Sequence, residues 1–276
     1  RGVNPEPLLK KLAPLRGHVD AINLTDNALG KVKMSGLVFG AMIKSRLGIP
    51  VVLNFSCRDR NLLALKSDLL GAGALGIDAV VALTGDKLML AGDAHAVREL
   101  NAFGLLRVIG ALNRGDTGEG KPALKTVARL VAGAVANPNR RDLNREFDLI
   151  RRKAEAGAKF LITQPVFDAA DARAFIRRAG EHGLKVVLGI LPIKRAAMAH
   201  YMRDRVNDLS DVRGHLERYT GLSEEQARRQ SLEENLALMR ALACDAAGFN
   251  IMSGGGPSLA IELALEFSRW RAQPGA

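Results

Sequence analysis

The chain has 276 residues, 47% of them hydrophobic, and carries a formal net charge of +11. This length suits one α/β barrel with a large apolar core, which needs neither a disulfide nor a metal for stability. The charge points to anionic partners. Aromatic residues make up only 4% of the chain, however, which argues against the base-stacking platforms of nucleic-acid-binding proteins.

Other classes of protein are disfavoured by particular residues. Cys57 and Cys244 lie far apart and the five histidines show no ligand spacing, so we expect no metal site. No apolar run is long enough to span a membrane, and the first residues do not resemble a signal peptide. We therefore expect a cytoplasmic protein that binds neither membrane nor nucleic acid.

The chain is expected to open on a helix, because Pro5 and Pro7 suit a first turn and leucines follow at helical spacing. Apolar, β-branched runs then alternate with amphipathic stretches, which is typical of a parallel sheet covered by helices. The predicted strands are Val19–Leu24, Val51–Cys57, Ala79–Leu83, Leu130–Val135, Phe160–Thr163, Val186–Ile190 and Phe249–Met252. The predicted helices between them are Asn61–Gly71, Asp142–Ala156, Ala169–His182, Glu224–Ala241 and Ser258–Arg271.

This alternation predicts a single (β/α)₈ TIM-barrel domain over residues 1–276. A closed barrel has eight strands and opens on a strand, so we expect the first strand to precede Arg1. A doubly wound open sheet is the alternative, but no GxGxxG follows the first predicted strand.

Barrel enzymes carry their chemistry where strands end, and five polar clusters follow the predicted strands. The first two, 23–27 and 54–61, offer Asn, Thr and Asp side chains that could equally cap turns. In the second, Arg58 and Arg60 could bind an anion or pair with Asp59 and Asp68, and Asn61 could cap a helix.

The later clusters offer a glycine beside a carboxylate, small residues and an amide. Gly85 would let the backbone approach a planar ligand, with Asp86 able to take part in proton transfer. The small residues at 134–136 leave room for a ring system. Gln164 suits the amide-like edge of a pterin, and Phe167 could stack on it or belong to the core.

Three segments are expected to be loops, the first two because together they are rich in Gly, Asp and Lys and the third because of its three glycines. Segment 87–92 is a candidate binding loop, 114–125 a second loop or a surface insertion, and 253–257 a turn that could bind phosphate.

Taken in order, these clusters resemble the methylenetetrahydrofolate reductase family. The resemblance rests on DAINLTDN, CRDRNLLALKSDLLGAGALGIDAVVALTGD, GAVANP, RKAEAGAKFLITQPVFD and VVLGILP, with weaker similarity in MSGGGPSLAIELALEF. It implies an FAD-dependent barrel that passes hydride from NAD(P)H to methylenetetrahydrofolate, in the one-carbon metabolism that supplies methionine.

The resemblance also implies roles for individual residues. Asp86 and Gln164 would be catalytic, and Gln164 and Phe167 would bind folate. The implied flavin contacts are Thr25, Asn54, Leu83, Thr84, Gly85, Asp86, Ala102, Ala136, Asn137, Arg152 and Lys153, the last two near the phosphates.

Several positions depart from the family pattern. Asn54 stands where many members have histidine, Asn137 replaces an aromatic residue, and Ala196 lies where another aromatic is expected. The family's proton-donating acid lies in the strand expected before Arg1. Two alternatives therefore stay open: a flavin-free reductase with direct hydride transfer, and a noncatalytic accessory barrel. A second copy of the chain and an electron-transfer subunit are the candidate protein partners.

Overall fold

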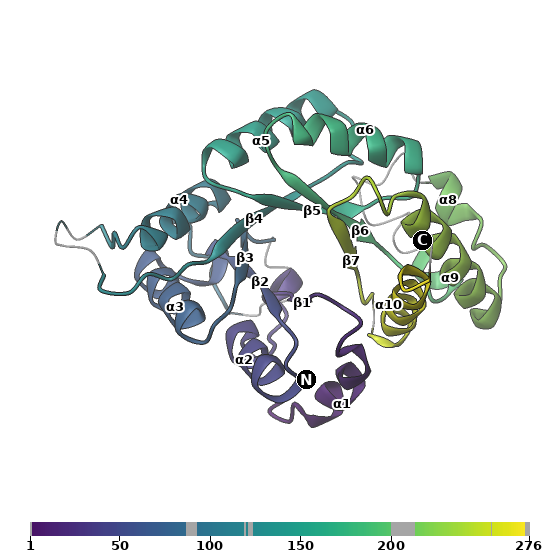
Figure 1. Ribbon diagram of the computed structural model, residues 1–276, viewed down its shortest axis with the longest axis horizontal. Helices are drawn as coiled ribbons and strands as arrows, with labels where there is room; N and C mark the ends of the chain where they lie inside the picture. The colour runs from purple at the N-terminus through teal and green to yellow at the C-terminus, as the bar shows by residue number, and fades with distance from the viewer. Residues whose placement is uncertain are drawn as a thin grey trace. The chain divides into compact units, whose positions relative to one another are not determined.

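The computed structural model describes residues 2–86, 93–118, 120, 124–199, 213–254 and 256–273. Within them seven strands form a sheet in the order β1 to β7, alternating with helices (Figure 1). The pairs β1–β2, β2–β3, β3–β4 and β6–β7 are all parallel. The chain thus has the strand order and helix alternation of a (β/α)₈ barrel, as the sequence predicts.

The strands are β1 (Ile22–Leu24), β2 (Val51–Ser56), β3 (Ala79–Leu83), β4 (Val131–Ala136), β5 (Phe160–Pro165), β6 (Lys185–Ile190) and β7 (Gly248–Ile251). The α-helices are α1 (Glu6–Leu12), α2 (Gly36–Leu47), α3 (Leu62–Ala74), α4 (Ala102–Asn113), α5 (Leu143–Glu155), α6 (Ala169–Gly180), α8 (Arg213–Glu217), α9 (Glu224–Ala241) and α10 (Ser258–Arg271). Three short 3₁₀ turns are Ala13–Leu15, Ala28–Gly30 and Cys57–Asp59.

The predicted strands are confirmed within a few residues, and β3 has the predicted bounds. The first strand is shorter than expected, because Val19–Ala21 lie before the first pairing with β2. Among the described residues three helices, α2, α4 and α8, are absent from the prediction. Helix α2 is apolar around most of its circumference and contains glycines, so it lacks the amphipathic period that reveals α5. Helix α8 is only five residues long, and the helical spacing of the buried Leu105, Ile109 and Leu112 in α4 was overlooked.

Contacts between Cα atoms divide the chain into two compact units. Unit 1 is Arg1–Val135 with Arg152–Phe160, and unit 2 is Ala136–Arg151 with Leu161–Ala276. In unit 1, α2 packs against β2 and α4 against β3. In unit 2, α6 packs against β6, and α10 packs against both α9 and β7.

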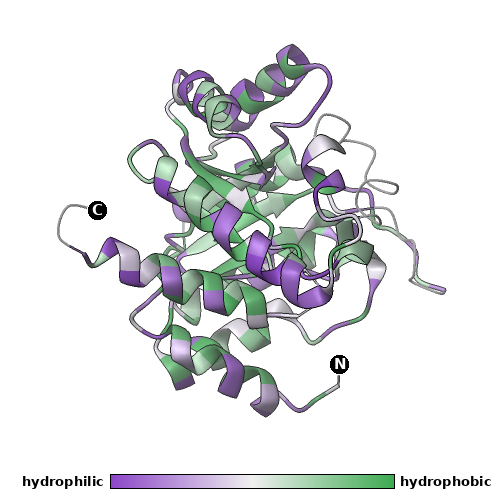
Figure 2. Ribbon diagram, turned by 90° about the vertical axis from the view of Figure 1, so that its right-hand side faces the viewer, coloured by the Kyte–Doolittle hydropathy of each residue, from purple (hydrophilic) through white to green (hydrophobic). Residues whose placement is uncertain are grey.

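The core of each unit consists of strand residues and the inward faces of helices. Strand β3 is typical, since Val80, Val81 and Ala82 are all fully buried. Figure 2 shows hydrophobic strands and helices that carry alternating hydrophilic and hydrophobic stripes. At Gly133 of β4 the ring of Phe160 occupies the space that a Cβ atom would need, so this position requires glycine.

Helix ends follow the sequence closely. Asn61 caps α3 by accepting a hydrogen bond from the Ala64 N–H, as predicted. Ser223 and Gln226 form a capping box at the start of α9. Among the described residues no helix is long and apolar enough to cross a membrane.

Candidate active site

The ends of β1 and β2 in unit 1 are joined by side-chain amides. The Asn54 Nδ2 atom donates to Asn23 Oδ1 at 2.9 Å and to the Leu24 carbonyl at 3.0 Å. Thr25 is exposed, and its hydroxyl lies 3.4 Å from the Lys33 ammonium. Asn54 therefore bridges two neighbouring strands at the edge where barrel enzymes bind ligands.

The arginines of the CRDR segment form ion pairs, which was one of the two sequence interpretations. The Arg58 guanidinium pairs with Asp59, and that of Arg60 with Asp68. Arg60 also pairs at 2.6 Å with Asp26, a partner that the sequence did not indicate. Asp26 is buried and accepts a hydrogen bond from the Ser56 N–H as well. The internal pairs make this cluster a framework between strand ends rather than an anion site.

The segment Leu83–Asp86 follows β3 and lies against the arginine cluster. Gly85 has φ +100°, and a Cβ there would overlap the Ser56 hydroxyl and the Arg58 Cβ. The Asp86 carbonyl accepts a hydrogen bond from Arg58 at 3.1 Å, while the Asp86 residue itself is exposed. The glycine thus allows the close approach of two strand-end loops.

The start of α4 is tied to the same segment. The Ala102 N–H donates to the Thr84 hydroxyl at 3.1 Å, and Asn101 caps the helix through the Gly104 N–H. These bonds bring Thr84 and Ala102, two residues implied by the family resemblance, into direct contact.

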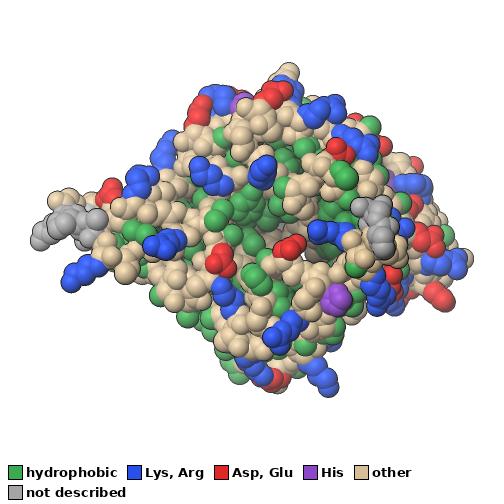
Figure 3. Space-filling view, viewed as in Figure 1, with side chains coloured by type: hydrophobic (Ala, Val, Ile, Leu, Met, Phe, Trp, Pro, Cys, Tyr) green, Lys and Arg blue, Asp and Glu red, His purple; other side chains and the backbone are tan. Residues whose placement is uncertain are grey.

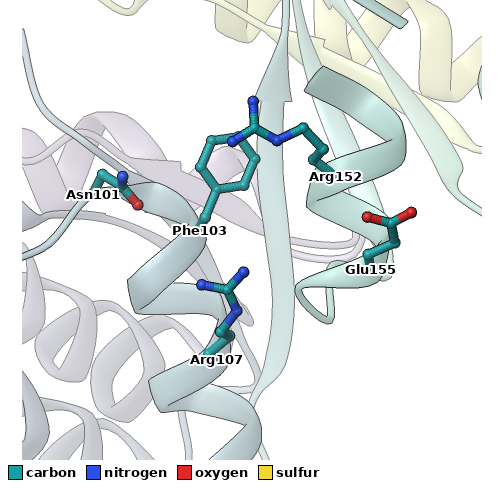
Figure 4. Close-up of a pocket in the computed structure, with 5 residues that line it drawn as sticks. All are labelled: Asn101, Phe103, Arg107, Arg152 and Glu155. Atoms are coloured by element: carbon teal, nitrogen blue, oxygen red, sulfur yellow. The ribbon is translucent and has the colours of Figure 1, made fainter. Parts of the chain in front are cut away.

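A polar cavity of about 190 Å³ lies between α4 and α5 (Figure 4). It is lined by Asn101, Phe103, Arg107, Arg152 and Glu155. The Arg152 guanidinium lies over the Phe103 ring, 4.7 Å from its centre. Ligand pockets usually enclose roughly 300–1,000 Å³, so this cavity suits one part of a larger ligand. The two guanidinium groups outweigh the single Glu155 carboxylate, so the lining remains net positive and favours an anionic part.

Lys153 takes a different direction from Arg152. It is buried, and its ammonium group donates to the Val135 carbonyl of β4 at 2.7 Å. The two cations were expected to act together. The structure instead brings Arg152 to the cavity and Lys153 to the strand backbone.

In unit 2, the loop after β4 is held by a buried carboxylate. Glu146 accepts a hydrogen bond from the Asn137 N–H at 3.0 Å and pairs with Arg140 at 2.8 Å. Ala136 is buried, and the Asn139 side chain donates to the Pro165 carbonyl at 2.8 Å. The loops after β4 and β5 are thus joined.

In unit 2, Gln164 is the second-last residue of β5 and Phe167 lies just after the strand. Gln164 is exposed at the end of the strand, and Asp168 caps α6. The Phe167 ring lies 4.7 Å from the ring of His215 in α8, which the sequence did not indicate. Burial lowers the pKa of His215, opposed by the Glu234 carboxylate and reinforced by Arg218.

Glu234 joins this pair to the core of unit 2. The hydroxyl of the fully buried Tyr219 donates to Glu234 at 2.8 Å, and burial together with this carboxylate raises the pKa of Tyr219. Phe167 therefore rests on a hydrogen-bonded cluster.

The predicted site residues are divided between the units. Unit 1 holds Thr25, Asn54, Leu83, Thr84, Gly85, Asp86, Ala102, Arg152 and Lys153, and unit 2 holds Ala136, Asn137, Gln164 and Phe167. Asn101, Phe103 and Arg107 were missed because their helix was missed. An apolar run that begins with the helix-capping sequence Asn-Ala would have been the signal.

The predicted loop 87–92 lies outside the described residues, as do Glu119, residues 121–123 and Gly255 of the other two loops. In the last of these, the Lys194 ammonium donates to the carbonyls of Ser253 and Gly256. Burial lowers the pKa of Lys194, with a smaller effect from Arg195.

On the face shown in Figure 3, Lys and Arg side chains lie singly and in small groups over the whole surface, with acidic side chains among them. In the part of the chain that the structure describes, no cluster of His, Cys, Asp and Glu could hold a metal ion. The buried Cys57 has its pKa raised by burial to about 11, so its thiol stays protonated at neutral pH.

Comparison with known proteins gives one family match. The model of the family described as methylenetetrahydrofolate reductase matches residues 4–236. A comparison with curated proteins finds no match.

Solved structures share the fold at low identity. An uncharacterized protein from Clostridium thermocellum that binds two copies of 5-methyl-5,6,7,8-tetrahydrofolic acid has a TM-score of 0.62 at 15% identity, covering 98% of this chain and 92% of its own. EDTA monooxygenase from Chelativorans sp. BNC1 has a TM-score of 0.63 at 13% identity, covering 97% and 87%. At such identities these structures support the barrel fold alone.

Proposed function

The chain belongs to the methylenetetrahydrofolate reductase family, and on this basis we propose that it is a flavin-dependent reductase of folate. In the proposed reaction, hydride from NAD(P)H reduces 5,10-methylenetetrahydrofolate to 5-methyltetrahydrofolate with uptake of one proton. FAD, when bound, supplies the two-electron chemistry that links the two substrates.

The observation that carries the proposal is the group of contacts around the start of α4. Thr84 and Ala102, from separate implied flavin segments, are hydrogen-bonded to each other. The next residue after Ala102 is Phe103, which lies with Arg152 in the polar cavity. Three segments that the family resemblance assigns to the flavin thus meet within unit 1.

The donor set at this cavity fits the phosphates of FAD. Arg107 and Arg152 each present a guanidinium group, which binds phosphate oxygens through paired N–H donors. Asn101 marks the N-terminus of α4, where the helix dipole favours negative charge. In the proposed site these residues would hold the phosphates, and Leu83–Asp86 would line the flavin.

The residues proposed for folate lie in unit 2. The exposed Gln164 amide offers both a donor and an acceptor to a pterin, and the Phe167 ring offers an apolar face. The folate bound by the similar Clostridium thermocellum protein favours this substrate class for the present fold.

The test is an absorption spectrum of purified protein before and after addition of FAD, followed by assays with each substrate. The proposal predicts flavin absorption bands at about 450 nm that bleach when NAD(P)H is added and return when methylenetetrahydrofolate is added. Nicotinamide oxidation by a protein that never takes up FAD would identify a flavin-free reductase. Failure to take up FAD and to turn over either substrate would favour an accessory barrel.

A further inference from the structure

Arg58 is a buried cation whose donors reach three separate loops of unit 1. The residue is 5% exposed, and its guanidinium pairs with Asp59 in the loop after β2. Its Nη2 atom donates to the Asn27 carbonyl after β1 at 2.9 Å, and its Nη1 atom donates to the Asp86 carbonyl after β3 at 3.1 Å. One planar side chain therefore links the ends of β1, β2 and β3.

The backbone of Arg58 adds a fourth connection. Its carbonyl accepts a hydrogen bond from the Val97 N–H at 2.8 Å. Val97 lies four residues before Asn101, the cap of α4. Arg58 thus holds Asp86 through its side chain and the approach to α4 through its main chain.

The loops on either side of Arg58 have backbones that need this support. Asn27 has φ +38°, a left-handed conformation that costs a non-glycine residue free energy. Gly85 has φ +100° and packs directly on Ser56 and on the Arg58 Cβ. The direction of Asp86 follows from this close packing, because Asp86 is the next residue along the chain.

We propose that Arg58 is a positioning residue: it fixes the Asp86 loop and the approach to α4 relative to each other, so that Asp86 is correctly placed at the flavin ring. The proposal rests on the proposed function for the role of Asp86. The contacts of Arg58 with Asp59, Asn27, Asp86 and Val97, here called the Arg58 clamp, do not depend on any cofactor. A lysine at position 58 would keep the charge and lose the planar fork, so it could not reach Asp59, Asn27 and Asp86 together.

The first measurement is amide hydrogen exchange in flavin-free protein. The informative amides are those of Val97 and Ala102, which donate to Arg58 and Thr84. We expect Arg58→Lys to speed their exchange about tenfold relative to amides of α9. The matched control is Arg60→Lys, which alters the neighbouring ion pairs without touching Asp86 and should leave that ratio unchanged. The proposal would be overturned if Arg58→Lys sped exchange of the α9 amides as much as that of Val97 and Ala102, or if Arg60→Lys changed the ratio as much as Arg58→Lys does.

The second measurement is a double-mutant cycle on kcat/KM with Asp86→Asn. If Arg58 acts through Asp86, Arg58→Lys should lower kcat/KM by tenfold to about a hundredfold in the native background and less than about twofold beside Asp86→Asn. Additive effects would refute the positioning role and leave the proposed function intact. A native protein without reductase activity would refute the proposed function, and the exchange ratio alone would then decide the clamp.

A milder variant covers the case in which Arg58→Lys does not fold. Asp59→Asn keeps the arginine but weakens the carboxylate that orients it. It should speed exchange of the Val97 and Ala102 amides in the same direction and by a smaller factor. No change in either amide would count against the proposal.

Discussion

Unit 1 contains two pairs of arginines in contrasting surroundings. Arg58 and Arg60 direct their donors to the protein's own carboxylates and carbonyls. Arg107 and Arg152 instead line a polar cavity, one of them above an aromatic ring. Arginines satisfied by the protein stabilise the strand-end loops, whereas arginines that line a cavity can bind a ligand. The position of an arginine in the sequence does not show which of these roles it has, whereas the groups that its guanidinium contacts do.

The largest expected effect on stability concerns the Arg60–Asp26 pair. Asp26→Asn should keep the shape of the side chain and leave the Arg60 cation without its most buried partner. Breaking a buried ion pair from one side costs about 3–5 kcal/mol. Chemical unfolding of the variant measures this loss.

The control for that experiment is Asp78→Asn, which removes the partner of Lys44 in a pair where the Asp78 side chain is 68% exposed. A surface pair contributes less than about 1 kcal/mol. Equal losses in the two variants would contradict the assignment of Asp26 to the structural framework.

The next effect concerns the packing of Gly85 on Arg58. Gly85→Ala should lower the free energy of unfolding by about 3 kcal/mol, because it adds a steric overlap to an unfavourable φ. Gly17→Ala is the matched control, since Gly17 also has positive φ (+77°) but nothing lies within 4 Å of its added Cβ. The control should lose about 1 kcal/mol. Thermal unfolding measures the stability that each variant loses. Similar losses would show that the close packing of Gly85 on Ser56 and Arg58 does not contribute to stability.

The framework of unit 1 could be predicted only in part. Apolar runs located β3 correctly because its buried residues Val80, Val81 and Ala82 are adjacent and the two valines are β-branched. The pairing of Arg58 with Asp59 was one of two interpretations, since neighbouring charges often pair. The pairing of Arg60 with Asp26 could not be predicted, because the two residues are far apart in the sequence and meet only when β1 and β2 align.

The cavity of unit 1 also could not be predicted from the pattern of residues in the sequence. Arg152 was named through the family resemblance, while Arg107 lies in α4, a helix that the prediction missed. The contrast between Arg152 and Lys153 depends on side-chain direction at the end of α5. Adjacent helical positions point about 100° apart, so equivalent cations reach different surroundings.

A smaller effect should appear in the pH dependence of stability. The hydrogen bond from Arg58, offset in part by burial, lowers the pKa of Asp59 from its usual 3.8. The folded protein therefore holds the Asp59 proton less tightly than the unfolded chain does. The resulting stabilisation is full well above pH 3.8 and is lost as the pH falls through the lowered pKa.

Asp59→Asn should abolish this part of the pH dependence. Denaturant unfolding between neutral and acid pH should show native protein and variant converging as Asp59 becomes protonated. A difference in stability that stays constant across this range would contradict the role of the Asp59 charge.

The smallest effect concerns the ring beneath Arg152. Phe103→Leu removes the aromatic face and should weaken FAD binding about threefold, as expected for a partly exposed cation–π contact. Phe103→Tyr retains that face and serves as the control. Isothermal titration with FAD distinguishes the two variants, and equal affinities would show that the ring does not orient the arginine.

Binding of the FAD phosphates in the cavity between α4 and α5, as proposed, is tested most directly by the dissociation constants for FAD of Arg152→Met and Arg151→Met. Both changes remove one charge from the same helix turn, but Arg151 pairs with Asp148 and does not line the cavity. Loss of a charge-assisted hydrogen bond predicts weakening by tenfold to about a hundredfold for Arg152→Met alone. Equal affinities in the two variants would contradict the account.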